Sequence, residues 1–340
     1  MRTQIDRIAF YLPRMDVIDW LMQGDPAIRW QVLRDLIEAS EDEVEAERRR
    51  VETDGWGARL LGLRDPDGQW AGGACFPKWV ADEWRAGNPP DFSNGQPWTS
   101  TLPSLATLRE LGLDPASGSA RETTALVAKN CRWEHDGQAY FDGEVEACIN
   151  GRTLATGAYF GADVESLCSR LLDEQLGDGG WNCETEQGST VSSFHSTICV
   201  LEGLWEYERA GGTLPVSEAR ARGEEYLLQR HLFHSLRTGE VIRQSWLRFA
   251  WPVQWHYDVL RGLDHFWSVG GRPDERLAEA AELVRGKRAD DGRWVMDRVH
   301  GGQVHFTFEG EGEPSRWNTL RALRVLRWYD ASQDQPVPDP

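Results

Sequence analysis

The amino-acid sequence predicts an all-α fold built from repeated helix pairs. A short turn made of Gly, one further residue and Trp recurs three times along the chain of 340 residues, which contains 17 tryptophans. Segments that follow these turns carry apolar residues at three- and four-residue spacing, which is typical of amphipathic helices. The length does not require two separate domains, because in repeat architectures each unit packs only on its neighbours.

The three turns share one pattern: a long polar residue, three spacers, Gly, any residue and Trp. They end at Trp70, Trp181 and Trp294. Each contains an Asp-Gly pair, which tolerates a left-handed backbone, and the Trp then places a large apolar ring against neighbouring helices. A degenerate copy at residues 136–138 is followed by Tyr140 and Phe141 in place of the Trp.

The first 54 residues differ from the repeats. Asp25 and Pro26 predict the N-cap and first turn of a helix over 27–39, and Ser40 predicts the start of a helix over 41–51. We expect residues 1–54 to form a helical cap on the first repeat and residues 55–330 to form the repeat domain. The Pro-rich, polar residues 331–340 predict a flexible tail.

Four later helices are predicted to open with an aromatic residue followed by a polar one. Gly112, Gly211 and Gly270 follow such helices and predict their ends. The turns and the openings together indicate about five to six helix pairs. The four openings are Trp98-Thr99, Phe194-His195, Trp255-His256 and Trp317-Asn318.

Charge and hydropathy argue against several classes of partner. Lys and Arg number 37 against 55 Asp and Glu, so the net charge of −18 repels nucleic acid and an anionic membrane surface. No window approaches the roughly 20 apolar residues of a membrane span, and the first residues lack the apolar stretch of a signal peptide. We therefore expect a cytoplasmic protein. Its six cysteines are thinly spread, which favours reduced thiols or metal ligands over a disulfide framework.

The turn with Gln175, Gly179 and Trp181 resembles the repeat signature of the terpenoid cyclase and protein prenyltransferase superfamily. The resemblance covers about residues 55–330. It implies an α/α toroid, in which concentric helices surround a central cavity, with the aromatic-polar openings near one mouth of the barrel. Shorter members act on isoprenoids, so the resemblance implies a Trp-rich cavity for a small apolar or isoprenoid-like substrate.

A candidate zinc site lies at this mouth. Glu146, Cys148 and His195 are similar to the zinc ligands of the prenyltransferase β subunit, where a Cys lies two residues after an acidic ligand and a His opens a later inner helix. Cys183 is a further thiolate candidate, so the predicted set is Cys148 and His195 with Glu146 or Cys183. Three protein ligands leave a fourth zinc position open for chemistry. The structural alternative is a buried Cys148 and a His195 that caps its own helix.

A second candidate group surrounds the start of a later helix. His256 and Asp258 are candidate catalytic residues, since both can point into the mouth from a helix start. Guanidinium groups bind carboxylate or diphosphate oxygens, and aromatic faces stabilise cations. The candidate substrate-binding residues are therefore Arg248, Arg261, Trp255 and Tyr257. The structural alternative pairs Asp258 with Arg261 and makes His256 the helix cap.

The sequence thus predicts an enzyme whose zinc activates a thiol or a water molecule. Two alternatives stay open. One is a metal-free cyclase, although the chain lacks the Asp-Xaa-Asp-Asp motif that keeps a central acid protonated in such enzymes. The other is a toroid that binds a partner without catalysis. Protein prenyltransferases need a second, helical-repeat subunit, so the resemblance also raises a partner subunit encoded elsewhere.

Overall fold

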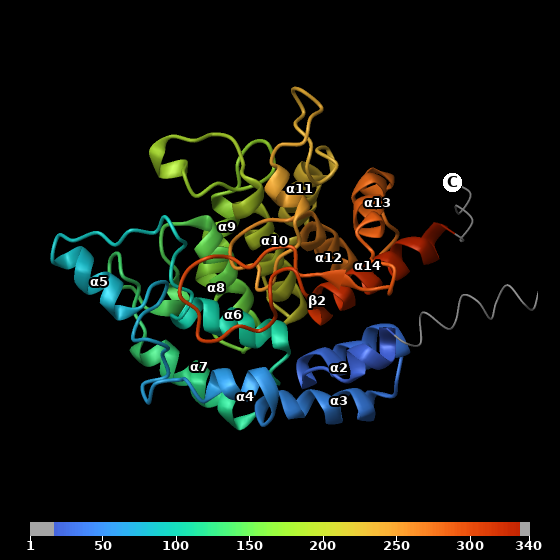
Figure 1. Cartoon of the computed structure of the whole chain (residues 1–340). Coiled ribbons are helices and arrows are strands. Elements are labelled where there is room, and N and C mark those ends of the chain that lie inside the picture. Colours follow the sequence, from blue (N-terminus) through green and yellow to red (C-terminus); the bar gives the residue numbers. More distant parts are fainter. Residues whose placement is uncertain (1–16, 334–340) are drawn as a thin grey trace, which may run out of the picture.

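The computed structural model describes residues 17–333, and these form an all-α fold, as predicted (Figure 1). Apart from two-residue strands β1 (Trp294–Val295) and β2 (Pro314–Ser315), which pair antiparallel, the regular elements in this range are helical. No helix among the described residues is long and apolar enough to cross a membrane. The α-helices are α2 (Pro26–Val32), α3 (Glu41–Arg49), α4 (Gly55–Leu61), α5 (Lys78–Arg85), α6 (Thr101–Leu111), α7 (Gly118–Asn130), α8 (Ala147–Tyr159), α9 (Glu165–Asp173), α10 (Phe194–Arg209), α11 (Ser217–Leu228), α12 (Val259–Val269), α13 (Ala278–Gly286) and α14 (Arg316–Gln333).

The even-numbered helices form a closed ring of contacts. Contacts run from α4 through α6, α8, α10 and α12 to α14, which contacts α2, and α2 returns to α4. Other helices pack on this ring: α9 contacts α8 and α10, α11 contacts α10, and α13 contacts α12 and α14 (Figure 1). A ring of helices with further helices packed on it is the arrangement expected of an α/α toroid.

Glycines bring α8 and α10 into close contact. A Cβ on Gly151 would lie 2.5 Å from the backbone of Cys199, and one on Gly203 would lie 2.5 Å from the Gly151 carbonyl oxygen and 3.3 Å from the Cβ of Leu154. These contacts advance in the same direction along both helices, so α8 and α10 run parallel. Their amino ends therefore lie side by side, and the candidate site forms there.

The three Gly-Xaa-Trp turns make the same hydrogen bonds. Each indole is fully buried, and its Nε1–H donates to the carbonyl of the residue ten positions earlier, at 2.9, 2.7 and 2.7 Å in chain order. Each Trp backbone N–H also donates to a Thr hydroxyl in the next ring helix. Every turn therefore ties the helix before it to the next helix of the ring. The three pairs are Trp70 with Thr101, Trp181 with Thr197, and Trp294 with Thr319.

The degenerate turn at residues 136–138 buries a different set of aromatic side chains from the other three turns. Tyr140 is buried there, and Trp133 stacks on it with ring centroids 5.0 Å apart. The indole of Trp133 donates to the Tyr140 carbonyl at 2.8 Å. A stacked pair thus replaces the single Trp of the other turns.

The helix openings differ in detail from the prediction. α6 begins at Thr101 and α12 at Val259, three or four residues after the aromatic residues Trp98 and Trp255. The reason is that Ser100 and Asp258 occupy the N-cap positions, which are not helical. Phe194 does begin α10.

The N-terminal helices close the ring. Asp25 caps α2 as predicted, accepting the N–H of Ala27 at 2.9 Å, but α2 ends at Val32 and continues as a π-helical segment, Leu33–Ile37. Because α2 contacts both α14 and α4, these helices join the last repeat to the first. The boundary at residue 54 stays a prediction, and the predicted tail falls mostly outside the described residues.

Ser40 opens α3 through a reciprocal capping box. Its hydroxyl accepts the N–H of Glu43 at 3.4 Å, and the Glu43 carboxylate accepts the Ser40 N–H at 3.1 Å. We expect Ser40→Ala to lower the free energy of unfolding by about 1 kcal/mol, because the first turn loses its cap. Urea unfolding measures this. The control is Ser166→Ala, an exposed helix residue that should cost nothing; an equal cost at both positions would contradict the prediction.

Candidate metal centre and adjoining pockets

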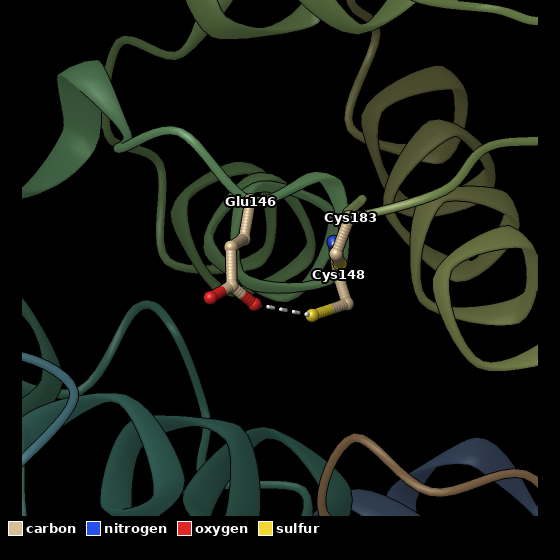
Figure 2. A group of neighbouring side chains, drawn as sticks. All are labelled: Glu146, Cys148 and Cys183. Carbon is tan, nitrogen blue, oxygen red and sulfur yellow. Dashed lines mark hydrogen bonds between the residues drawn. The ribbon is translucent and has the colours of Figure 1, made fainter. Parts of the chain in front are cut away.

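Three side chains of metal-binding type meet at the amino end of α8 (Figure 2). Glu146 is the N-cap residue of α8, Cys148 is its second residue, and Cys183 lies in the loop before α10. One ligand atom of each lies within 4.8 Å of the other two. Figure 2 shows the Glu146 carboxylate beside the Cys148 thiol, whose Sγ donates to Oε2 at 3.5 Å. Cys148 is buried, whereas Glu146 is exposed.

Glu144 and Asn150 hold the start of α8 in place. The Glu144 carboxylate accepts the N–H of Glu146 at 2.8 Å. The Asn150 side chain accepts the N–H of Glu144 at 2.7 Å and donates to its carbonyl at 2.9 Å. Burial raises the pKa of Glu144. Neither residue was predicted from the sequence, because α8 also contains Arg152, Thr153 and Thr156, and no local pattern distinguishes Asn150 from these polar residues.

Cys183 is the more acidic of the two thiols. Hydrogen bonding between the side chains of Cys183 and Cys148 is the main cause of the lowered pKa of Cys183, opposed by burial and assisted by the Ser196 hydroxyl and the Cys148 backbone N–H. Its Sγ lies 3.1 Å from Ser196 Oγ and 3.3 Å from the backbone nitrogen of Cys148. The hydrogen bond with Cys183, together with burial, raises the pKa of Cys148. Cys183 is therefore the sulfur poised to be a thiolate, as expected beside a helix amino end.

His195 lies outside this group of three. Its Nδ1 accepts the backbone N–H of Tyr257 at 2.8 Å, and its ring meets Trp255 edge-on, with centroids 5.2 Å apart. Burial, with the charges of Arg261 and Arg243, lowers the pKa of His195 to about 4.

The structure brings three of the four candidate metal ligands together. Cys148 is accompanied by both Glu146 and Cys183, which were alternatives, and His195 is not part of the group. Successive residues on an α-helix point about 100° apart. Ser196 faces Cys183, so the preceding residue, His195, turns toward the start of α12.

Asp258, and not His256, caps α12. Its two carboxylate oxygens accept the N–H groups of Arg261 at 2.8 Å and Ala250 at 3.2 Å, and burial raises its pKa. The Arg261 guanidinium pairs instead with Glu202, through two bonds of 2.7 Å. The alternative in which Asp258 pairs with the Arg261 side chain and His256 caps the helix is wrong. Catalytic roles for His256 and Asp258 stay predictions.

The other side chains predicted to bind substrate are also engaged within the protein. The Tyr257 hydroxyl donates to the Leu232 carbonyl at 2.7 Å, and the Trp255 indole donates to Gln96 at 3.2 Å. Arg248 is exposed and pairs with Glu311 at 3.0 Å and with the Asp297 carbonyl. Their binding of substrate stays a prediction.

A pocket of about 200 Å³ lies beside the start of α12. His195, His256 and His300 line it, and His256 stacks between Trp255 and His300, with ring centroids 3.8 Å from both. Burial lowers the pKa of His256 to about 2 and that of His300 to about 4, so these rings are neutral at pH 7. His300 was not predicted, because it lies in a loop without a recognisable pattern.

A cavity of about 290 Å³, called the central cavity below, is lined by residues of α3 and of six ring helices, α2, α6, α8, α10, α12 and α14. Five tryptophans line it: Trp30, Trp205, Trp251, Trp267 and Trp317. Its wall also carries ion pairs, which were not predicted from the sequence. The pairs are Arg261 with Glu202, Arg109 with Glu206, and Arg321 and Arg324 with Asp264.

Comparison with known proteins gives one distant relationship. No family model matches the chain, and no solved structure matches it. Human lanosterol synthase is 24% identical to it over 201 residues, which cover 52% of this chain and 27% of that enzyme. The chain thus spans about a quarter of the length of this relative. Together with the all-α fold, the similarity supports a distant relationship to the terpenoid cyclase-like superfamily.

Proposed function

We propose that this protein is a zinc-dependent enzyme in which Glu146, Cys148 and Cys183 hold the metal. The observation that carries the proposal is the convergence of their ligand atoms within 4.8 Å of one another. A carboxylate and two thiolates form a donor set that suits zinc, whereas magnesium and calcium prefer oxygen ligands. Three protein ligands leave a fourth tetrahedral position for a substrate or water.

The spacing of Cys148 and Glu146 and the lowered pKa of Cys183 support a zinc ion, which would have to displace the proton of Cys148. Neighbouring donors on a tetrahedral zinc with bonds of about 2.0–2.3 Å lie about 3.5 Å apart, and Cys148 Sγ lies 3.5 Å from Glu146 Oε2. Metal-binding thiols must lose their protons, and Cys183 already has a lowered pKa. The hydroxyl of Ser196 would orient the Cys183 sulfur. When bound, zinc would supply a Lewis acid that activates a thiol or a water molecule.

The proposed substrate is a small molecule with an apolar or isoprenoid-like part. The similarity to lanosterol synthase supports this class. The tryptophan faces of the central cavity also support it, because aromatic faces attract cationic centres. The ion pairs on the same wall favour a substrate that carries a polar group as well. Reduced thiols persist in the cytoplasm, which is the location that we propose.

The metal-free alternative requires a carboxylic acid that stays protonated. Burial raises the pKa values of Glu202 and Asp264 in the central cavity, but their arginine partners outweigh it and lower both, Glu202 to about 2. Both are therefore carboxylates at neutral pH. Asp258 has a raised pKa, but its oxygens accept two backbone N–H groups at the start of α12. This alternative would rest on Asp258, and the zinc proposal has the better support.

Elemental analysis of protein purified under reducing conditions with added zinc tests the proposal. We expect about one zinc per chain, lost in Cys148→Ala and Cys183→Ala. The matched control is Cys168→Ala, which removes a buried cysteine outside the group and should retain the metal. His195→Ala should also retain it, because His195 lies outside the group.

Circular dichroism would establish that each variant is folded. Absence of zinc from the wild-type protein, or its retention in both Cys148→Ala and Cys183→Ala, would refute the metal site. In that case the Asp258 alternative would become the leading one. Loss of zinc in His195→Ala with an intact fold would instead restore His195 to the ligand set.

A further inference from the structure

The pocket beside α12 contains two arginines whose guanidinium groups are not hydrogen-bonded or ion-paired to any of the described residues. They are Arg243 and Arg298, and both line the pocket. A third arginine, Arg248, is paired with Glu311. The net charge of the chain is −18, so carboxylates are abundant, yet within the described range none forms an ion pair with these two guanidinium groups. A hydrogen bond from the Val299 N–H lowers the pKa of Glu311, and the charge of Arg298 helps to lower it, but the ion pair of Glu311 is with Arg248. An anion from outside would supply a hydrogen-bonded partner for each of the two.

The neutral groups of this pocket can also bind an anion. His195 uses Nδ1 to accept the N–H of Tyr257, so its Nε2 carries the proton and is a donor. Nδ1 of His256 is buried and has no hydrogen-bond partner among the described residues. A protonated Nδ1 would be a second donor.

Asp258 is the carboxylate that could oppose an anion here. It lines the same pocket, but it is buried, and its oxygens accept the backbone N–H groups of Ala250 and Arg261. These bonds place its charge at the amino end of α12, where the helix dipole offsets it. Arg243 and Arg298 therefore leave the pocket with positive charge.

We propose that this pocket binds the carboxylate or phosphate group of a small molecule between Arg243 and Arg298. Guanidinium groups bind both kinds of oxyanion through paired hydrogen bonds. His256 is stacked between Trp255 and His300, so the edges of these three rings form the wall beside the rest of the ligand. A volume of about 200 Å³ suits a small anionic compound. None of the three proposed zinc ligands lines the pocket, so the inference does not rest on the metal.

Isothermal titration calorimetry of the full chain tests this inference. Inorganic phosphate and benzoate are titrated separately at constant ionic strength into protein freed of metal with a chelator, which prevents phosphate from binding zinc. We expect saturable binding of at least one anion to the wild-type protein. The affinity should fall about tenfold or more in Arg243→Gln and in Arg298→Gln, because the loss of a hydrogen bond to a charged group weakens binding by about this factor. The anion that binds more tightly identifies the ligand as a phosphate or a carboxylate.

Arg272→Gln is the matched control. It removes the same charge from an exposed position that does not line the pocket, so its affinity should equal that of the wild-type protein. Thermal unfolding would establish that all three variants are folded. The inference is wrong if neither anion binds at millimolar concentrations. It is equally wrong if Arg243→Gln and Arg298→Gln bind as tightly as Arg272→Gln.

Discussion

Replacing Trp181 by alanine is expected to lower the free energy of unfolding by about 3–5 kcal/mol. The indole is fully buried, and its Nε1–H donates to the Leu171 carbonyl at 2.7 Å. It also packs against α11 so closely that a Cβ on Gly223 would lie 2.9 Å from the ring. Alanine therefore leaves a large cavity and an unpaired carbonyl. Urea unfolding followed by far-ultraviolet circular dichroism measures the change.

The repeat structure supplies both replicates and a control for this experiment. Trp70→Ala and Trp294→Ala should cost similar amounts, because all three indoles are buried and make equivalent hydrogen bonds. Trp79 on α5 is 47% exposed, so Trp79→Ala should change the stability by about 0.5 kcal/mol or less. A loss at Trp181 no larger than that at Trp79 would show that the turns do not anchor the helices.

Local signals explain why the sequence predicts this fold. A Gly-Xaa-Trp turn needs residues that are close in the chain, and so do the caps at Asp25 and Ser40. Helical periodicity is equally local. N-cap preferences, which are also local, would have predicted two helix starts more accurately. Ser100 and Asp258 are ordinary N-cap residues, and they precede the true starts of α6 and α12.

The candidate site depends on contacts that local patterns do not encode. The sequence identifies Glu146, Cys148 and Cys183 one by one, but their meeting depends on how the loop before α10 packs on the start of α8. His195 shows the limit most clearly. One residue along α10 separates the side that faces Cys183 from the side that faces Tyr257, and the fold alone decides which residue takes which side.

The charged wall of the central cavity was missed for a related reason. Arginine and glutamate on a helix usually indicate a face exposed to solvent, and the sequence alone does not show that they point inward. Glu202 on α10 and Arg261 on α12 become partners because the ring places these helices in contact. An experiment on this ion pair therefore tests whether α10 and α12 are neighbours in the ring.

Glu202→Gln is expected to lower the free energy of unfolding by about 3 kcal/mol at pH 7. Arg261 has a side-chain exposure of 4%, and the variant leaves its buried charge without the carboxylate that binds it through two bonds of 2.7 Å. The matched control is Glu311→Gln. It breaks the pair with Arg248, in which both side chains are about half exposed, and should cost less than about 1 kcal/mol.

The pH dependence separates this ion pair from simple packing. Burial raises the pKa of Glu202 in the folded protein, but the charge of Arg261 outweighs this effect. The pKa therefore falls from its ordinary value of 4.5 to about 2. The stabilisation is therefore complete above about pH 4.5 and is lost as the pH falls through 2. We expect the stability difference between the wild-type protein and Glu202→Gln to shrink as the pH is lowered from 5 toward 2. A difference that stays constant over this range would mean that the variant acts through packing, and that the carboxylate does not form the ion pair that joins α10 to α12.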